Sequence, residues 1–394
     1  MVVIDYMGQA QAVRDELIAR RRDLHVHPEL AFQEIRTAGI VAKALSDLGL
    51  EVQTGVGKTG VVAVLEGDKD GPTVLVRADM DALPIIEANK TDYVSIESGK
   101  MHACGHDGHT SIALGVAKLF VQHRDQIAGR IKFVFQPAEE IAGGALAMIE
   151  DGVLENPRPD VSLGLHLWNN LPLGTIGVAE GPTMAGSSIF KITITGHGGH
   201  GAQPQMTADP IVCAAQMITA LQTIVSRNVN PADTAVVSVT MVRAGDTHNV
   251  IPQQAELTGT MRAFKTEVRD LVTRRMEEIV RNISLAMGCK AEFDIQHLTI
   301  PVVNHPEVTA KLRAKFAEMV GDEKLDPEAR TMGGEDMAYL MNDIPGMFFF
   351  VGSANSQRGL DYGHHHPRFD FDEEALPLGM ALLSAAIGEY VFSE

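Results

Sequence analysis

Short apolar segments of the strand type alternate with helical segments along this chain, and the alternation restarts near Ser187 with a cycle of its own. In the first cycle the strand candidates are VVAVLEG, PTVLVRADMDAL, GRIKFVFQPAEE and DVSLGLHLW, and stretches such as HTSIALGVAKLFVQHRD between them have helical spacing of apolar residues. Alternating strands and helices form layered α/β domains, in which ligands gather beyond the carboxyl ends of the strands. The pattern therefore predicts an α/β protein whose functional residues follow its strands.

The second cycle predicts a separate unit inserted into the first. Its order is strand, helix, strand, strand, helix, strand, a βαββαβ arrangement that runs from SIFKITITG to KAEFDIQHL. The helices and the strand that follow are assigned back to the first domain, because GHHHP among them adds metal-capable side chains. We therefore expect one domain in two parts, residues 1–184 and 297–394, and an inserted domain at residues 185–296. A length of 394 residues fits two units, because one hydrophobic core seldom grows beyond roughly 250–300 residues.

Charge and apolar runs exclude several classes of partner. With 33 Lys and Arg against 51 Asp and Glu, the net charge is −18, which opposes binding to nucleic acid and to anionic membranes. No apolar run reaches membrane-spanning length, and the first residues lack the pattern of a secretory signal. Three scattered cysteines cannot form a disulfide framework, which fits a reducing compartment. We expect a cytoplasmic protein that binds neither nucleic acid nor membrane.

Metal-capable side chains follow the strand candidates of the first domain. A hydrolytic site with two metal ions needs several ligands from separate segments, and one carboxylate that stays free to accept a proton from the attacking water. Two adjacent glutamates in a turn can divide these tasks, because one can face a metal while the other faces the substrate. The candidates are Cys104, His106, Glu139, Glu140, His166 and the histidines at 364–366.

Each candidate also has an ordinary structural explanation. A single histidine on an apolar strand, such as His166, is more often a hydrogen-bonded core residue than a ligand. Adjacent glutamates are usually solvated, and three consecutive histidines could form a surface run. Asp79 and Asp81, in RADMDALP, could cap a helix or form a turn. The gathering of these residues at strand ends favours a site with two metals over these explanations, though only somewhat.

Nine short blocks, in order between about residue 16 and residue 385, resemble one family of metallohydrolases. The blocks are LHVHPELAFQE, RADMDALPI, MHACGHDGHT, FQPAEE, GLHLW, GHGGHGAQP, NVIPQQAELTGTMR, GGEDMAYL and HHHPRFDFDEEAL. They are similar to the hippurate hydrolase branch of the aminoacylase and carboxypeptidase metallohydrolases, which includes auxin-conjugate hydrolases and N-acyl-amino-acid and N-acetyldiaminopimelate deacylases. The resemblance implies a metallopeptidase-like catalytic α/β domain, an inserted βαββαβ lid and dimerisation domain, and a homodimer or higher homo-oligomer.

The resemblance also implies roles for the matching residues of the first domain. Glu139 falls on the general base, and His365 is chosen among the three histidines because the family places its ligand two residues before the proline. Cys104 would bind as a thiolate in a position to bridge two metals. Asp79 stands where more distant relatives carry a histidine ligand, and it is left out of the ligand set. The implied ligands are Cys104, His106, Glu140, His166 and His365.

Further residues are expected to support the reaction. Asp81 matches an aspartate that supports the metal site without binding metal. Such a role is needed because a histidine that binds metal must have its other ring nitrogen held in place. In the inserted domain, His200 matches a histidine that stabilises the oxyanion, often in the partner subunit's site. Asn249 and Arg262 match positions that could hold the substrate's carboxylate or carbonyl oxygen. Arg262 could instead join the strands of its sheet, and Glu335 lies in a block that resembles a pocket loop.

The implied reaction is hydrolysis of the amide bond of small N-acyl amino acids, with two divalent ions as cofactors. Zn is the expected metal, and Mn, Co or Ni could replace it. One alternative is a carboxypeptidase or dipeptidase of the same fold. Two others are a metal-containing binding protein without catalysis and thiol catalysis by Cys104 with a nearby histidine. The residues leave open which acyl group and which amino acid the site prefers.

Overall fold

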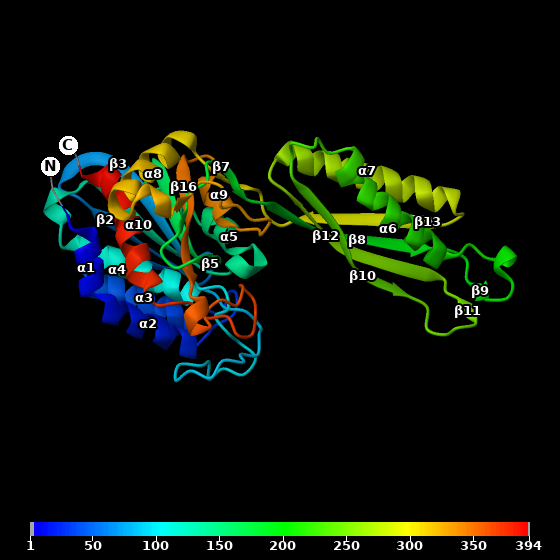
Figure 1. Cartoon of the computed structure of the whole chain (residues 1–394), viewed down its shortest axis with the longest axis horizontal. Helices are drawn as coiled ribbons and strands as arrows, with labels where there is room; N and C mark the ends of the chain where they lie inside the picture. The colour runs from blue at the N-terminus through cyan, green and yellow to red at the C-terminus, as the bar shows by residue number, and fades with distance from the viewer. Residues whose placement is uncertain (1–3, 393–394) are drawn as a thin grey trace. The chain divides into compact units, whose positions relative to one another are not determined.

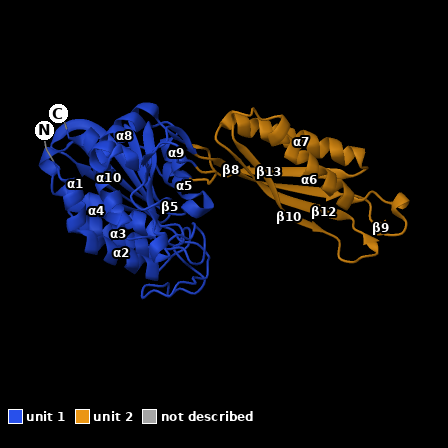
Figure 2. Ribbon diagram, viewed as in Figure 1, with its two compact units in different colours: residues 1–183, 303–330, 336–394 blue, residues 184–302, 331–335 orange. Residues whose placement is uncertain are grey.

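The structure is a computed structural model that describes residues 4–392, and the chain divides into two compact units. Unit 1 takes in residues 1–183, 303–330 and 336–394, and unit 2 takes in residues 184–302 and 331–335 (Figure 2). Backbone hydrogen bonds explain why the residues near Thr299 and Gly333 belong to unit 2. Ala185 N donates to Gly333 O, and Ser187 N donates to Thr299 O. The segments around Thr299 and Gly333 therefore continue unit 2, whereas the sequence pattern assigns them to the first domain.

Unit 1 is built on a mixed sheet that has eight strands within the described residues, in the order β1-β2-β4-β3-β5-β16-β6-β15. Figure 1 labels its strands β2, β3, β5 and β16. The four central strands β4, β3, β5 and β16 run parallel to one another. Strand β16 is buried on both faces, because Phe348, Phe349 and Phe350 are all inaccessible, as in a parallel sheet covered by helices. The strands are β1 Glu51–Val56, β2 Gly60–Glu66, β3 Lys69–Asp79, β4 Ala128–Gln136, β5 Val161–Pro172, β6 Ile176–Gly177, β15 Leu325–Asp326 and β16 Gly346–Ala354.

Helices cover this sheet, and two of them form the centre of the core. Helices α4 and α10 pack against each other and against strands β3 and β5. Helix α10 is apolar around its whole circumference, which suits a fully buried helix, and Pro377 lies in its first turn, where proline is tolerated. The helices of unit 1 are α1 Tyr6–Ala12, α2 Arg14–Val26, α3 Ile35–Asp47, α4 His106–Val121, α5 Gly144–Glu150, α8 Pro306–Val320, α9 Met337–Met341 and α10 Ala375–Val391.

Unit 2 is an antiparallel sheet in the order β10-β12-β8-β13 with helices α6 and α7 packed on one face. Helix α6 begins at Pro210, and Asp209 caps it by accepting hydrogen bonds from Ile211 N and Val212 N. On the other face of the sheet, Ile189 and Met241 are exposed. The elements are β8 Gly186–Thr195, α6 Pro210–Arg227, β10 Ala235–Ala244, β12 Gln254–Ala263, α7 Thr266–Ala286 and β13 Lys290–His297. Their chain order is βαββαβ, so the predicted fold class is confirmed.

Shorter elements complete the two units. Strands β9 Gly199–His200 and β11 Val250–Ile251 pair with each other, as do β7 Gly181–Met184 and β14 Val302–Asn304. Single 3-10 turns occur at η1 Arg124–Gln126, η2 Glu139–Ile141, η3 Pro204–Met206, η4 Asp322–Lys324 and η5 Ser356–Arg358. Within residues 4–392, none of the helices combines the length and the apolar composition that crossing a bilayer requires.

Candidate metal centre

The sheet of unit 1 brings the candidate ligands together, because neighbouring parallel strands end at one edge. Strand β3 ends at Asp79, and turn η2 with Glu139 and Glu140 follows strand β4 directly. His166 lies on strand β5, next to β3, and His106 is the first residue of helix α4. Gly105 precedes that helix with φ +93°, a left-handed conformation that glycine adopts without strain. This turn lets the chain place both residues that flank Gly105 at the same edge.

Five groups of possible metal ligands form among the described residues, and two of these donor groups share Cys104. The first group consists of Cys104, His106 and His166, and the second consists of Cys104, Glu140 and His365; within each, the ligand atoms lie within 4.8 Å of one another. The Cys104 Sγ atom lies 3.6 Å from His166 Nε2, and His365 Nε2 lies 3.3 Å from Glu140 Oε2. All five predicted ligands therefore lie together. Cys104 could therefore supply its sulfur to a metal ion held by either group.

The other ring nitrogens of these histidines are already engaged. Nδ1 of His106 lies 2.9 Å from the backbone oxygen of Asp81 and 3.2 Å from its carboxylate, so it carries the proton. Nδ1 of His166 likewise donates to Leu167 O at 2.7 Å. Nε2 is therefore the nitrogen of each ring that a metal ion would bind, once any proton on it has been displaced. Among the described residues, the buried His106 Nε2 and Glu140 Oε1 have no hydrogen-bond partner, so the donor set fits divalent cations.

Charges around the centre also favour a cation. Burial lowers the pKa of His106, but Asp79, Asp81 and Glu140 outweigh burial and raise it to about 10. A hydrogen bond to Glu140 raises the pKa of His365 as well. In both cases positive charge at the ring is stabilised by the surrounding carboxylates. A metal ion that displaces these protons would meet the same attraction.

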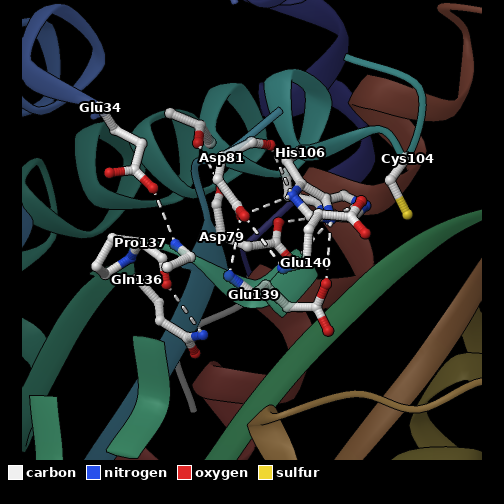
Figure 3. Close-up of polar contacts among 12 residues, drawn as sticks. Glu34, Asp79, Asp81, Cys104, His106, Gln136, Pro137, Glu139 and Glu140 are labelled. Atoms are coloured by element: carbon white, nitrogen blue, oxygen red, sulfur yellow. Dashed lines mark hydrogen bonds and ion pairs between the residues drawn. The ribbon is translucent and has the colours of Figure 1, made fainter. Parts of the chain in front are cut away.

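Turn η2, which carries Glu139 and Glu140, is strained and is held by carboxylates. Ala138 and Ala142, on either side of it, have φ values of +52° and +53°, a conformation that costs about 1–3 kcal/mol for a residue with a side chain. Asp81 accepts hydrogen bonds from Glu139 N at 3.1 Å and Glu140 N at 3.0 Å, and Figure 3 shows its carboxylate pointing at the turn. Asp81 thus holds both the turn and His106.

Asp79 belongs to a further group of possible ligands with His106 and His109, and both of its carboxylate oxygens have partners. Oδ2 accepts a hydrogen bond from Arg77 at 2.7 Å, and Oδ1 lies 2.6 Å from Nδ1 of His109. His109 Nε2 in turn accepts from Leu167 N at 2.9 Å. Burial raises the pKa of Asp79, but His106, Arg77 and His109 outweigh burial and hold it well below its usual range. Asp79 therefore links strand β3 to β5 through His109.

The two other histidines of the GHHHP segment lie outside the donor groups. His364 is half-buried, its ring stacks on Trp168 with centroids 4.5 Å apart, and its Nε2 accepts a hydrogen bond from Asn169 N. His366 stacks on Tyr362 with centroids 4.6 Å apart. His364 therefore supports strand β5, while His366 lies in the loop that carries the candidate ligand between them.

The three candidate residues of unit 2 fall into two places within that unit. His200 pairs with Val250 in the β9–β11 ribbon, whose strands Figure 1 labels. Gly201 N donates to Asn249 O, so His200 and Asn249 lie together. Arg262 lies toward the other end of strand β12, opposite Ser187. Its guanidinium donates to Ser188 O on the neighbouring strand β8 at 3.4 Å and to Met261 O at 3.0 Å. The contacts of Arg262 within unit 2 are those expected of a residue that joins strands.

Sequence reasoning missed several buried polar residues around the centre. Glu34 accepts a hydrogen bond from Ala138 N, as Figure 3 shows. Asp336 accepts from Gln136 and pairs with Arg77, all of them buried. Each of these residues lies in or beside a block already noted, such as FQPAEE or GGEDMAYL. The blocks therefore carried a signal, but their spacing did not show which residue contacts which.

The donor groups and their carboxylate supports agree with a comparison against known proteins. Residues 75–389 match the sequence profile of Peptidase family M20/M25/M40. The chain belongs to this family. The predicted relationship to the aminoacylase and carboxypeptidase metallohydrolases is thereby confirmed, and the chain is a hydrolase of this family.

The names of relatives within the family indicate the cleavage of different bonds. N-acetylcysteine deacetylase of Bacillus subtilis (strain 168) is 42% identical over 367 residues, 93% of this chain and 94% of the relative. Thermostable carboxypeptidase 2 of Saccharolobus solfataricus is 39% identical over 376 residues, 94% of each chain. The crystal structure of the Bacillus subtilis YXEP protein, described as a dinuclear metal binding peptidase from the M20 family, superposes with a TM-score of 0.82 at 38% identity, covering 96% of this chain and 99% of that one.

Proposed function

We propose that this protein hydrolyses the amide bond of small N-acyl amino acids, with two divalent metal ions, Zn being the expected metal. The observation that carries the proposal is the pair of donor groups that share Cys104, directly beside turn η2 with Glu139. The name of the Bacillus subtilis relative, N-acetylcysteine deacetylase, supports an acyl group on the nitrogen of an amino acid.

Each donor group would hold one ion. Cys104, His106 and His166 would bind the first, and Cys104, Glu140 and His365 would bind the second. When bound, the ions supply Lewis acidity, which makes water more acidic and offsets the negative charge that develops on the amide oxygen. Thiolate, imidazole and carboxylate ligands together suit Zn, with Mn, Co and Ni as substitutes.

Glu139 is proposed as the general base. Its Oε2 atom lies 4.0 Å from His106 Nε2, beside the donor groups, while its backbone N–H is held by Asp81. In this position the carboxylate can accept a proton from the attacking water and then pass it to the nitrogen of the leaving amino acid. General acid and base catalysis of this kind contributes about 10²- to 10⁴-fold to a rate.

Unit 2 is proposed to act as a lid and dimerisation domain that supplies groups for the substrate. His200 would donate a hydrogen bond to the amide oxygen as negative charge develops, a contribution of about 3–4 kcal/mol for one donor. Asn249 lies beside it and could bind the same part of the substrate. Arg262 is proposed to bind the substrate's carboxylate, although its contacts in unit 2 also fit a structural role.

Hydrolysis of a substrate panel tests the proposal. The panel consists of N-acetyl, N-benzoyl and indoleacetyl amino acids together with dipeptides, assayed before chelation, after chelation, and after adding back Zn, Mn, Co or Ni. We expect chelator-sensitive release of free amino acid from the N-acyl substrates. Activity confined to dipeptides would instead support a peptidase, an alternative favoured by the carboxypeptidase of Saccharolobus solfataricus.

The same panel separates two other functions. Cys104 Sγ lies 3.6 Å from His166 Nε2, so thiol catalysis is a geometric alternative. That alternative predicts activity that survives chelation and is lost on alkylation. A complete lack of metal-dependent hydrolysis across the panel would favour a binding protein.

We also propose a homodimer or a higher homo-oligomer in the cytoplasm. The exposed apolar side chains of Ile189 and Met241 on the open sheet face of unit 2 support an assembly, and the three free cysteines suit a reducing compartment. Light scattering of the purified protein measures the mass in solution. A monomer with full activity would contradict the proposed assembly.

A further inference from the structure

Asp336 holds both ends of the turn that carries Glu139 and Glu140. One carboxylate oxygen, Oδ1, accepts a hydrogen bond from Gln136 Nε2 at 2.5 Å, just before the turn. The other, Oδ2, accepts from Ala145 N at 3.0 Å, just after it. One buried side chain thus ties the end of strand β4 to the beginning of helix α5.

The turn leaves little freedom between these two points. Pro137 and Gly144 approach so closely that a Cβ atom on Gly144 would lie 1.5 Å from Pro137 O. Left-handed conformations at Ala138 and Ala142 turn the chain between them, and this strain persists only where the surroundings hold the backbone. The contacts of Asp336 are therefore part of what keeps the turn closed.

Asp336 is also tied to the base of the metal centre. Arg77 Nη2 lies 3.3 Å from Asp336 Oδ1, and Arg77 Nη1 lies 2.7 Å from Asp79 Oδ2. The side chains of Arg77, Asp79 and Asp336 are each no more than 1% exposed, so water does not weaken these contacts. A carboxylate oxygen of Asp336 lies within 4.8 Å of one of Glu139. The chain enters unit 1 from residues 331–335 at this same residue.

We propose that Asp336 is a positioning residue, which sets the place of Glu139 by closing the turn from Gln136 to Ala145. This inference rests on the proposed role of Glu139. Asp336 is the first residue of unit 1 after the segment 331–335 of unit 2. The residue that begins this part of unit 1 therefore also holds the turn that carries Glu139. Glu34, which accepts from Ala138 N at 2.9 Å, holds the same turn from another segment.

The test is the substitution Asp336→Asn in the full chain. An asparagine keeps the shape but cannot accept hydrogen bonds at both positions. On whichever amide substrate the wild-type protein hydrolyses, we expect kcat to fall about 10- to 100-fold, the usual effect of removing a residue that orients a catalytic group. KM should stay within twofold and at least one Zn ion should stay bound, because Cys104, His106 and His166 lie outside the turn. Hydrogen exchange of the amides in residues 137–145 should become faster.

Two further variants make the result specific. Asp372→Asn is the matched control, because Asp372 is also buried and accepts hydrogen bonds from Asn355 and Arg358, outside the turn. We expect it to keep wild-type kcat. If Asp336→Asn does not fold, Gln136→Met removes one donor to Asp336 at nearly the same volume, and it should lower kcat and speed exchange in the same direction.

Unchanged kcat together with unchanged exchange in Asp336→Asn would overturn the inference, as would an equal loss of kcat in Asp372→Asn. The exchange measurement does not depend on activity. If the wild-type protein hydrolyses no amide, the proposed function fails, while exchange still shows whether Asp336 holds the turn.

Discussion

Among single residues, Cys104 is the member that the two proposed metal sites share. His166 belongs to one group and His365 to the other. Removing a shared ligand should weaken both sites, whereas removing an unshared ligand should weaken one. This difference gives a direct test of the proposed arrangement.

Cys104→Ala should lower bound Zn from two ions per chain to less than one, because both proposed sites lose a ligand. His365→Ala should retain about one ion, since the group of Cys104, His106 and His166 stays complete. Metal content is measured by mass spectrometry after dialysis against low micromolar Zn. Equal losses in the two variants would show that Cys104 is not shared.

Glu139 is predicted to serve the reaction without holding metal. Glu139→Gln should lower kcat by about 10²- to 10⁴-fold, the usual contribution of a general base, because the amide cannot accept the proton. Bound Zn should stay at the wild-type level. Steady-state kinetics and metal analysis of one preparation measure both quantities. Near-normal kcat would show that another group is the base.

At the scale of elements, a buried arginine joins helices α2 and α4 and the loop before α10. Arg21 on α2 contacts Asp107 in the first turn of α4 at 2.9 Å and Asp370 at 2.8 Å. The side chains of Arg21 and Asp107 are completely inaccessible, and His25 lies 2.7 Å from Asp107. This cluster fixes the beginning of the helix whose first residue is His106.

Arg21→Met should lower the free energy of unfolding by about 3–5 kcal/mol, because Asp107 would be left as a buried charge without its main partner. Arg20→Met is the matched control on the same helix. Arg20 pairs with the half-exposed Glu16, and such a pair contributes at most about 1 kcal/mol. Urea denaturation measures both variants. Similar losses in the two variants would contradict the importance of the buried cluster.

For the whole molecule, buried carboxylates predict how stability depends on pH. Burial raises the pKa of Glu87, but hydrogen bonds from His25 and Ser95 N outweigh burial and lower it. Burial likewise raises the pKa of Asp372, and contacts with Asn355, the backbone of Glu374 and Arg358 outweigh it. Since the unfolded chain has the higher pKa values, it binds more protons as the pH falls.

The free energy of unfolding should therefore be highest near neutral pH and should fall as the pH drops below about 4–5, where unfolded carboxylates begin to bind protons. Urea denaturation of the metal-free protein at several pH values measures this dependence. In Asp372→Asn the fall should be smaller, because one of the responsible groups no longer titrates. An equal fall in that variant would show that Asp372 contributes nothing to acid sensitivity.

The sequence by itself determined the kinds of elements and their order. Alternating apolar strands and helices predicted the α/β class, and a second cycle after Ser187 predicted the inserted βαββαβ unit. Both predictions were possible because the spacing of apolar residues in strands and in helices follows from which side chains must be buried. The sequence blocks also pointed to the family and to the candidate ligands, since those residues lie in short segments that keep their spacing.

Only the tertiary structure decided which residues hold the candidate centre in place. Gln136 and Asp336 are 200 residues apart in the chain, and Ala138 and Glu34 are 104 apart, yet each pair forms a buried hydrogen bond. Such contacts depend on the order of strands in the sheet and on where helices pack, which local spacing does not encode. The sharing of Cys104 by two donor groups arises in the same way, because His166 and His365 reach it from distant segments of the folded chain.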